Sequence, residues 1–212
     1  MQTIIRKIYY TIFPFSNYEK ELENAIGDSK TLIDVGCGSQ SPIYSFSRKF
    51  YSIGVDCFSP SIEKSKKAKI HNKYYKLNIM DIDKKFKANS FDCALASDVI
   101  EHFDKKEGLR LLKKMEKISR KKIIIFTPNG FLKQGEYDNN PWQVHKSGWT
   151  AEEMKKRGYK VVGINGLKSL RKEFTEIKYH PKIIWRIISD ITQIFTRNNP
   201  RKAFQILCIK TK

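Results

Sequence analysis

The stretch TLIDVGCGSQS, residues 31–41, is an apolar run that leads directly into a glycine-rich turn. Gly36 and Gly38 allow a tight turn and let backbone N–H groups approach a ligand closely. Position 41 is Ser, where a dinucleotide-binding turn has its third glycine, and Asp34 would repel a pyrophosphate. The same carboxylate suits a ligand that carries an ammonium group. We therefore predict a strand over 31–35, followed by a binding turn for a ligand other than a dinucleotide.

A second acidic residue stands at the end of the next apolar run. Asp56 closes the run 51–56, 18 residues after Gly38. An acidic side chain at the end of a second strand can accept hydrogen bonds from two ribose hydroxyls. Together with Asp34 and the turn at 36–38, it predicts a site for an amino acid joined to an adenosine.

Short apolar runs alternate with lysine-rich stretches of helical period along the whole chain. The predicted strands are 31–35, 51–56, 73–77, 91–97, 122–127, 159–164 and 203–209. The predicted helices between them are 42–50, 60–69 and 104–120. This alternation indicates an α/β fold with a largely parallel sheet covered by helices on both faces.

Two further stretches carry a family resemblance. The run FDCALASDVIEHF, residues 91–103, is similar to the fourth-strand motif of the class I S-adenosylmethionine-dependent methyltransferases, and Thr127-Pro128-Asn129 fits the end of their fifth strand. With the motifs above, the similarity covers roughly 30–165 and the terminal strand. It implies a Rossmann-like, seven-stranded, mostly parallel sheet of order 3-2-1-4-5-7-6, in which the last strand is antiparallel. It also implies S-adenosylmethionine as the cofactor, S-adenosylhomocysteine as the product, and no metal.

The resemblance also implies a set of cofactor-binding residues. They are Asp34, Gly36, Cys37, Gly38, Asp56, Cys57, Asn78, Ile79, Ser97 and Asp98. Asn78 stands where the family usually has an Asp that binds the adenine amino group, and Asp81 is the alternative if the third strand is longer. Ser97 and Asp98 either contact the methionine part of the ligand or simply cap the following helix.

His102 and His145 are the candidate catalytic bases, because a histidine that titrates near neutral pH suits deprotonation of a hydroxyl or amine. A structural hydrogen bond is the alternative for His102. The segment 129–150 resembles a small-molecule or glycan subgroup, similar to type 11 methyltransferases. Its polar and aromatic side chains are expected to wall the acceptor pocket. They are Tyr137, Asp138, Asn140, Trp142 and Trp149.

We expect one methyltransferase domain over 1–212, with an N-terminal helical segment at 1–28, an acceptor-side loop at 129–150 and a helical insertion at 167–200. In the N-terminal segment, one helical stripe is apolar and is formed by Ile4, Ile5, Ile8, Tyr9, Ile12 and Phe13. The insertion contains a predicted helix over 181–197 with two distinct faces. One face is apolar and is formed by Ile184, Ile187, Ile188, Ile191, Ile194 and Phe195. The other face is polar and is formed by Lys182, Arg186, Asp190, Gln193 and Arg197.

The amphipathic helix 181–197 admits three interpretations: it covers the acceptor pocket, packs in a dimer, or lies on a membrane surface. Packing against the protein is the default expectation, because Asp190 weakens the cationic face. The N-terminal stripe admits packing or membrane contact as well. The sequence indicates no oligomeric state.

The charge is strongly positive and uneven. Lys and Arg number 41 against 22 Asp and Glu, a net charge of +19, yet residues 1–60 hold six of each. The excess therefore lies on the later part of the fold and favours an anionic acceptor or an anionic membrane surface, although lysine-rich helix faces are often merely solvated. Nucleic acid is the less favoured partner, because the fourth strand lacks the Asn/Asp-Pro-Pro-aromatic signature of base-flipping methyltransferases.

The predicted function is methyl transfer from S-adenosylmethionine to a small-molecule, sugar or lipid-linked acceptor. An RNA methyltransferase and a non-catalytic S-adenosylmethionine-binding protein are the alternatives. Four cysteines without metal-ligand spacing favour free thiols in a reducing compartment. With no cleaved signal or membrane span predicted, we expect a cytoplasmic protein, with peripheral membrane contact as an open possibility.

Overall fold

The computed structural model describes residues 18–136 and 140–212. Its strands form one seven-stranded sheet in the order β3-β2-β1-β4-β5-β7-β6, and β7 runs antiparallel to both of its neighbours. The predicted fold is confirmed. The strands are β1 (Thr31–Val35), β2 (Tyr51–Asp56), β3 (Lys73–Lys76), β4 (Phe91–Ser97), β5 (Ser119–Pro128), β6 (Lys160–Leu167) and β7 (Ala203–Thr211).

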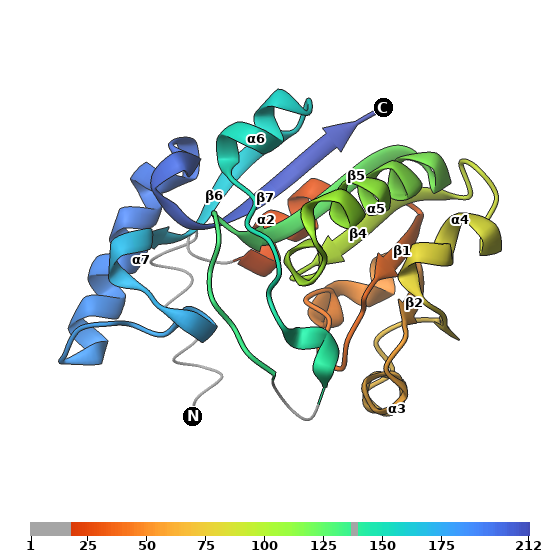
Figure 1. The fold of residues 1–212 in the computed structure, drawn as a ribbon, viewed down its shortest axis with the longest axis horizontal. Coiled ribbons are helices and arrows are strands. Elements are labelled where there is room, and N and C mark those ends of the chain that lie inside the picture. The colour runs from red at the N-terminus through yellow and green to blue at the C-terminus, as the bar shows by residue number, and fades with distance from the viewer. Residues whose placement is uncertain (1–17, 137–139) are drawn as a thin grey trace.

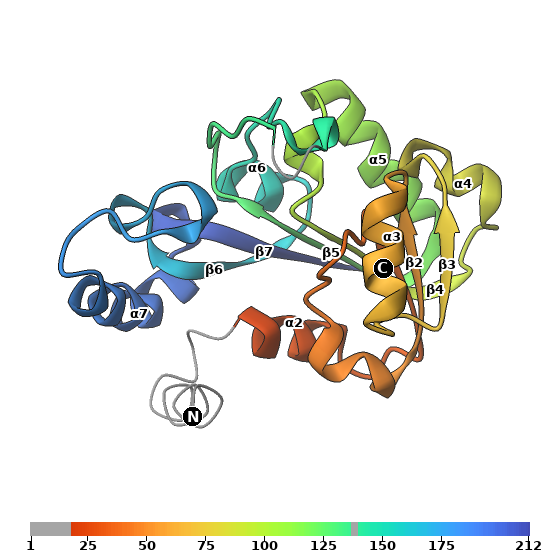
Figure 2. The same ribbon diagram turned by 90° about the horizontal axis from the view of Figure 1, so that it is seen from below.

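Helices cover both faces of the sheet, with α4, α5 and α6 on one side and α2 and α7 on the other (Figures 1 and 2). The helices are α2 (Tyr18–Ile26), α3 (Ser59–Lys67), α4 (Ile82–Lys85), α5 (Lys105–Ile118), α6 (Ala151–Lys156) and α7 (Lys182–Asn198). The helix predicted over 42–50 is a 3-10 helix over Tyr44–Lys49. The apolar stripe predicted at 4–13 lies outside the described residues.

The core consists of two apolar clusters, one on each face of the sheet. Because neighbouring side chains of a strand point to opposite faces, Leu32 of β1 enters one cluster while Ile33 and Val35 enter the other. The same alternation splits β5, whose Ile124 and Ile125 lie in different clusters. Both faces of the central strands are therefore dry, as a covered parallel sheet requires.

α7 packs on β6 with its polar face, not with its apolar face. Ser189, Asp190, Gln193 and Thr196 are buried. The isoleucines predicted for the apolar stripe are exposed instead. The helix thus packs against the domain, as expected, and the side that packs is the polar one. None of the described helices is both long and apolar enough to cross a bilayer.

The reason for the inverted packing lies in β6. A Cβ atom added to Gly163 would lie 2.1 Å from the carbonyl oxygen of Thr196, and one added to Gly166 would lie 2.1 Å from that of Ser189. The two backbones therefore touch, and only small or hydrogen-bonding side chains fit between them. Gln193 fills the remaining gap, since it accepts from the N–H of Gly166 at 2.8 Å and donates to the carbonyl of Gly163 at 2.7 Å.

Candidate active site

Two adjoining cavities lie at the carboxyl edge of the sheet, where β1, β2 and β4 end. The first has a volume of about 320 Å³ and the second about 420 Å³. They share Gly36, Gly38, Asp98 and Gln143 in their walls. All ten predicted cofactor-binding residues line one or both cavities. Asp56, Cys57, Asn78 and Ile79 line the first, whereas Asp34, Cys37 and Ser97 line the second.

The turn after β1 forms part of both cavity walls. Gly36 and Gly38 have φ angles of +74° and +56°, which are left-handed conformations that favour glycine. A Cβ atom on Gly36 would lie 2.7 Å from a methyl group of Val99, so this glycine is needed for packing. A Cβ atom on Gly38 would meet no atom within 4 Å. The space above Gly38 is therefore open to a ligand.

Asp56 is held rigidly at the end of β2. One carboxylate oxygen accepts from the backbone N–H of Gly38 at 2.9 Å, and the other accepts from that of Phe58 at 2.8 Å. Burial raises the pKa of Asp56 above its usual value, although these two N–H donors oppose the rise. The carboxylate is thereby oriented, with lone pairs left for hydroxyl groups of a ligand in the first cavity.

Asp34 is 1% exposed and is anchored from two sides. One of its oxygens accepts from the Ser41 hydroxyl at 2.5 Å and lies 3.0 Å from Nε2 of His71. His71 was not predicted, because no motif surrounds it. Cys37 packs against Gly54, where an added Cβ atom would lie 3.0 Å from the Cys37 Sγ and 3.0 Å from Nδ1 of His71. Burial raises the pKa of the Cys37 thiol.

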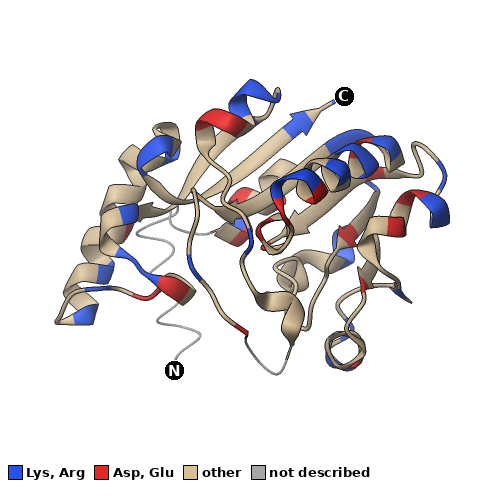
Figure 3. Cartoon of the chain, in the orientation of Figure 1, with Lys and Arg blue, Asp and Glu red and all other residues tan. Residues whose placement is uncertain are grey.

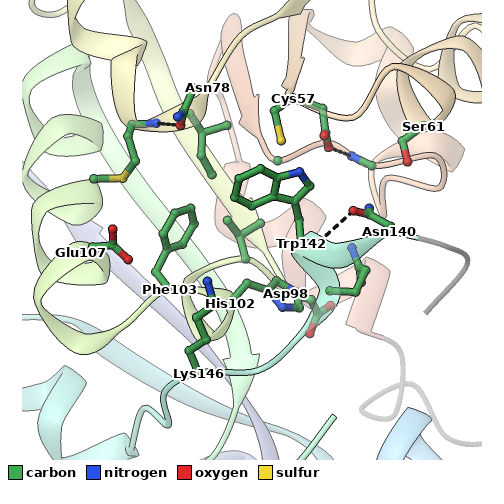
Figure 4. A pocket seen from close by; sticks show the side chains of 17 residues that line it. Cys57, Ser61, Asn78, Asp98, His102, Phe103, Glu107, Asn140, Trp142 and Lys146 are labelled. Atoms are coloured by element: carbon green, nitrogen blue, oxygen red, sulfur yellow. Dashed lines mark hydrogen bonds between the residues drawn. The ribbon is translucent and has the colours of Figure 1, made fainter. Parts of the chain in front are cut away.

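Between the two adenine-contact candidates, the geometry favours Asn78. Its side chain lines the first cavity, and its Oδ1 accepts from the N–H of Met80 at 2.9 Å (Figure 4). Asp81 does not line either cavity and forms an ion pair with Lys84 at 2.7 Å. The amide of Asn78 is therefore pinned by the following turn and faces the ligand space.

Asp98 lies where the two cavities meet and has an unusual backbone, with φ of +52°. Its carboxylate accepts from Gln205 and from Ser97, each at 3.3 Å, and Tyr18 lies 3.0 Å from the Ser97 hydroxyl. The residue is exposed toward the cleft, but burial of its carboxyl group among the surrounding residues raises the pKa of Asp98 to about 7. Tyr18 and Gln205 come from α2 and β7 and have no motif that could have revealed them.

The structure brings His102 and His145 together, with ring centroids 4.9 Å apart. Nδ1 of His102 lies 3.3 Å from the carbonyl oxygen of Val144, and Nδ1 of His145 lies 2.6 Å from that of Leu132. Because a carbonyl can only accept, each Nδ1 carries a proton, and Nε2 of the neutral ring keeps a lone pair. Burial, helped by the neighbouring His145, lowers the pKa of His102 to about 4; burial also lowers that of His145. Only His102 lines a cavity.

Glu101 completes this group and was not predicted. It is 2% exposed; Oε2 accepts from the Thr127 hydroxyl at 3.0 Å, whereas Oε1 has no hydrogen-bond partner among the described residues. Burial, followed by the charge of Asp98, raises the pKa of Glu101 well above its usual value. Glu101, His102 and His145 offer ligand atoms within 4.8 Å of one another, a spacing that suits a metal ion. The expectation of no metal stays a prediction.

The acceptor-side loop is divided between the cavity and the core. The first cavity is lined by Asn140, Trp142 and Lys146. The indole ring of Trp142 extends into the cavity toward Cys57 (Figure 4). Trp149 was expected in the pocket wall, but it is fully buried in the core, and its N–H donates to the Ile100 carbonyl and the Ser147 hydroxyl. Packing of its ring over Gly108 of α5 accounts for this placement. Tyr137 and Asp138 lie outside the described residues.

Comparisons with known proteins agree with this arrangement. Residues 33–126 match the family model described as a methyltransferase domain. No curated protein matches the sequence. A solved S-adenosylmethionine-dependent methyltransferase from Archaeoglobus fulgidus is 17% identical over 98% of this chain and 99% of its own, with a TM-score of 0.60. A putative S-adenosylmethionine-dependent methyltransferase from Listeria monocytogenes is 14% identical over 94% of this chain and 98% of its own, with a TM-score of 0.57.

A further similar structure is that of the small RNA methyltransferase HEN1, which is 18% identical over 90% of this chain and 24% of its own, with a TM-score of 0.56. At these identities the solved structures establish the fold that this chain shares with them. The predicted resemblance is therefore confirmed at the level of the domain and its fold. HEN1 is named for small RNA as its acceptor, whereas the Archaeoglobus and Listeria proteins are named for the cofactor alone, so the small-molecule or glycan subgroup stays a prediction.

Proposed function

We propose that this chain, whose residues 33–126 match a methyltransferase domain and whose fold is that of class I S-adenosylmethionine-dependent methyltransferases, methylates a hydroxyl group of a small-molecule, sugar or lipid-linked acceptor. S-adenosylhomocysteine is the second product. The observation that carries the proposal is the convergence of all ten cofactor candidates on two joined cavities, with His102 in the wall of the first. A pocket volume of a few hundred Å³ is typical of sites for ligands of this size.

The cavities suggest how the cofactor would be held. The adenosine would occupy the first cavity, where the fixed carboxylate of Asp56 faces the ribose hydroxyls and Asn78 faces the adenine. The amino-acid part would occupy the second cavity, where Asp34 is the counter-charge for its ammonium group. Asp98, which lines both cavities, would lie beside the cationic sulfur. The bound cofactor supplies an electrophilic methyl group on that sulfur.

His102 is the candidate base for the acceptor. Its pKa of about 4 keeps the ring neutral at physiological pH, and with the proton on Nδ1 the Nε2 atom is the one that could take a proton from the acceptor. When the bound cofactor gives its methyl group to the acceptor oxygen, His102 would take the proton that the hydroxyl loses. His145 is a positioning residue that packs against this ring. Alignment of donor and acceptor supplies much of the remaining acceleration.

The part of the first cavity wall that lies on the His102 side supports the proposed acceptor class. Trp142 offers an apolar ring, while Glu107, Asn140 and Lys146 offer charged and amide groups around it. An apolar surface with a few polar groups suits a sugar or a similar polyhydroxylated molecule. The similarity to an RNA-modifying enzyme and the net charge of +19 support RNA as the second candidate. A cytoplasmic location is supported by the four free cysteines.

Calorimetry with S-adenosylmethionine tests the proposal first. The Asp56→Ala variant should bind the cofactor roughly 10- to 100-fold more weakly, because two oriented acceptors are lost. The matched control is Asp81→Ala, which removes a surface carboxylate outside both cavities and should leave the affinity unchanged. Absence of cofactor binding in the unmodified protein, or equal affinity in Asp56→Ala, would contradict the proposal.

Transfer of an isotopically labelled methyl group then separates the acceptor classes. The hydroxyl proposal expects label in a sugar or lipid-linked fraction. RNA binding that weakens steeply with salt, together with label in RNA, would favour the second candidate, because phosphate contacts release counterions. Cofactor binding without transfer to any fraction would indicate a non-catalytic binding protein.

A further inference from the structure

The outer side of α7 is a continuous apolar surface, which we call the α7 apolar face. It consists of Phe195 and six isoleucines, Ile183, Ile184, Ile187, Ile188, Ile191 and Ile194. Their exposed fractions range from 36% for Ile188 to 72% for Phe195. Apolar side chains scattered singly over a surface are ordinary, but a contiguous group of this kind marks a binding surface.

The helix cannot rotate to bury this face. Its opposite side lies against Gly163 and Gly166, where a single added carbon would collide with the helix backbone. Gln193 and Thr192 bond to the backbone of β6 there, Thr192 through the N–H of Leu167 at 3.0 Å. Arg171 adds bonds to Ser189 at 3.0 Å and Asp190 at 3.1 Å. The outward direction of the isoleucines is therefore fixed by the fold.

The surroundings of the α7 apolar face are cationic. Lys178, Lys182 and Arg186 are exposed on or just before α7, and the Nζ atom of Lys182 lies 3.9 Å from the carboxylate of Glu176. Figure 3 shows Lys and Arg at several positions along this helix. An apolar face bordered by cations is typical of helices that lie in the headgroup region of an anionic bilayer. A second copy of this chain is a poorer partner, because each copy carries a net charge of +19.

The helix α7 contacts a segment that also forms part of the candidate site. Asn165 and Thr175, which flank the start of the insertion, line the second cavity. The carbonyl of Asn165 accepts from the Ser189 hydroxyl at 3.4 Å, and that of Thr175 accepts from Arg171 at 2.9 Å. The same segment therefore touches the buried side of α7 and the cavity wall. A bilayer bound to the outer side of α7 would be separated from this segment by the helix itself, which is about 10 Å across.

We propose that the α7 apolar face docks on the surface of an anionic lipid bilayer and holds the two cavities beside it. The proposal rests on the proposed function in one respect: it selects the lipid-linked acceptor among the acceptor classes. Docking itself needs no methyl transfer. Vesicle binding and cofactor binding can therefore fail separately, and the two failures are distinguishable.

Co-sedimentation with vesicles tests the docking. The full chain is mixed with phosphatidylcholine vesicles and with vesicles that also contain phosphatidylglycerol, and it should bind the anionic vesicles more tightly. The triple variant Ile184→Ser, Ile188→Ser, Ile191→Ser should lose roughly 10- to 100-fold in vesicle affinity, because three apolar side chains no longer leave water. Calorimetry with S-adenosylmethionine on the same variant should give unchanged affinity, which verifies that the fold and the cavities are intact.

A matched control removes exposed apolar side chains elsewhere. The variant Tyr44→Ser, Tyr51→Ser changes two exposed tyrosines outside the insertion and should bind vesicles like the unmodified protein. A charge pair adds a second comparison: Arg186→Glu on α7 should weaken binding to anionic vesicles more than Lys113→Glu on α5 does.

Three outcomes would overturn the proposal. The first is equal or absent binding of the unmodified chain to both kinds of vesicle. The second is a dimer in solution that the triple serine variant converts to a monomer without any vesicle binding, which would make the face a self-interface. The third is vesicle binding that survives the triple serine variant but is lost in Ile5→Ser, Ile12→Ser, which would assign the contact to the N-terminal segment instead.

Discussion

The helices α5 and α7 cover opposite kinds of face. In α5 the buried residues are Leu111, Leu112 and Met115, and lysines face solvent. In α7 the buried residues include Ser189, Gln193 and Thr196, and isoleucines face solvent. Both helices are amphipathic with helical period, so their sequences look alike to a pattern search. The difference lies in the surface beneath them. α5 lies over large apolar side chains of the sheet, whereas α7 lies directly on the glycines of β6. Periodicity therefore identifies two faces of a helix, and the partner decides which one is covered.

The largest expected effect is a loss of kcat on changing His102, which lies just before α5. The His102→Gln variant should lower kcat by about 10²- to 10⁴-fold, because the acceptor loses its base, while the affinity for S-adenosylmethionine stays unchanged. Steady-state rates and calorimetry measure the two quantities. The control is His180→Gln, an exposed histidine beside α7, which should leave both unchanged. Activity that is lost on dialysis against a chelator and restored by a divalent cation would reassign Glu101, His102 and His145 as metal ligands.

Two left-handed glycines give the next comparison. In Gly166→Ala, the added carbon meets the Ser189 carbonyl at 2.1 Å and φ is +68°, so we expect a loss of about 2–5 kcal/mol in unfolding free energy. Gly38→Ala has φ of +56° but open space, so it should cost only about 1–2 kcal/mol. Its main effect should be weaker cofactor binding. Thermal unfolding and calorimetry separate the two, and a lower melting temperature for Gly38→Ala than for Gly166→Ala would contradict this account.

In α7, replacing a polar side chain should lower the free energy of unfolding more than replacing an isoleucine, whereas in most helices the loss of an isoleucine costs more. Gln193→Ala leaves the buried N–H of Gly166 and the carbonyl of Gly163 without their partner, at a cost of about 1–3 kcal/mol. The neighbouring Ile194→Ser should change the unfolding free energy by no more than about 0.5 kcal/mol, because Ile194 is exposed. Denaturant unfolding of both variants measures this, and a larger loss for Ile194→Ser would mean that the isoleucines are covered in solution.

The smallest expected effect concerns pH. The pKa of Asp98 is about 7, so the carboxyl is mostly neutral at pH 6 and mostly anionic at pH 7.5 and above. An anion beside the cationic sulfur attracts it, so the affinity for S-adenosylmethionine should rise several-fold between about pH 6 and pH 7.5. S-adenosylhomocysteine has a neutral sulfur and should respond less. Calorimetry on Asp98→Asn should give no such difference between the two ligands; a difference that persists there would point to another group.

The side chains predicted to bind the cofactor lie together in the structure because most of them stand at strand ends. Asp56 and Ser97 are the last residues of β2 and β4, and Asp34 is the penultimate residue of β1. The carboxyl ends of parallel strands meet at one edge of a sheet, so strand spacing is enough to bring these residues together. β1, β2 and β4 also have the predicted bounds, since each is an apolar run ended by polar or glycine residues.

The site residues that were missed come from elements with no motif of their own. Tyr18 reaches Ser97 from α2, Gln205 reaches Asp98 from the antiparallel strand β7, and His71 reaches Asp34 from the loop before β3. Their contacts join residues far apart in the chain. A local pattern carries no information about such pairs, because the pairs exist only after the sheet has assembled.

The sequence by itself determined the alternation of strands and helices, the turn at Gly36 and Gly38 and the acidic strand ends, because these depend on local conformation and on the spacing of apolar residues along the chain. The order of the strands was an implication of the family resemblance, and the structure confirms it. Only the tertiary structure decided that His102 and His145 lie ring to ring and that α7 turns its isoleucines outward. Both outcomes depend on which backbone lies against which. Where two glycines let a helix backbone touch a strand, hydrogen bonds fill the contact, and the apolar side chains are left on the surface.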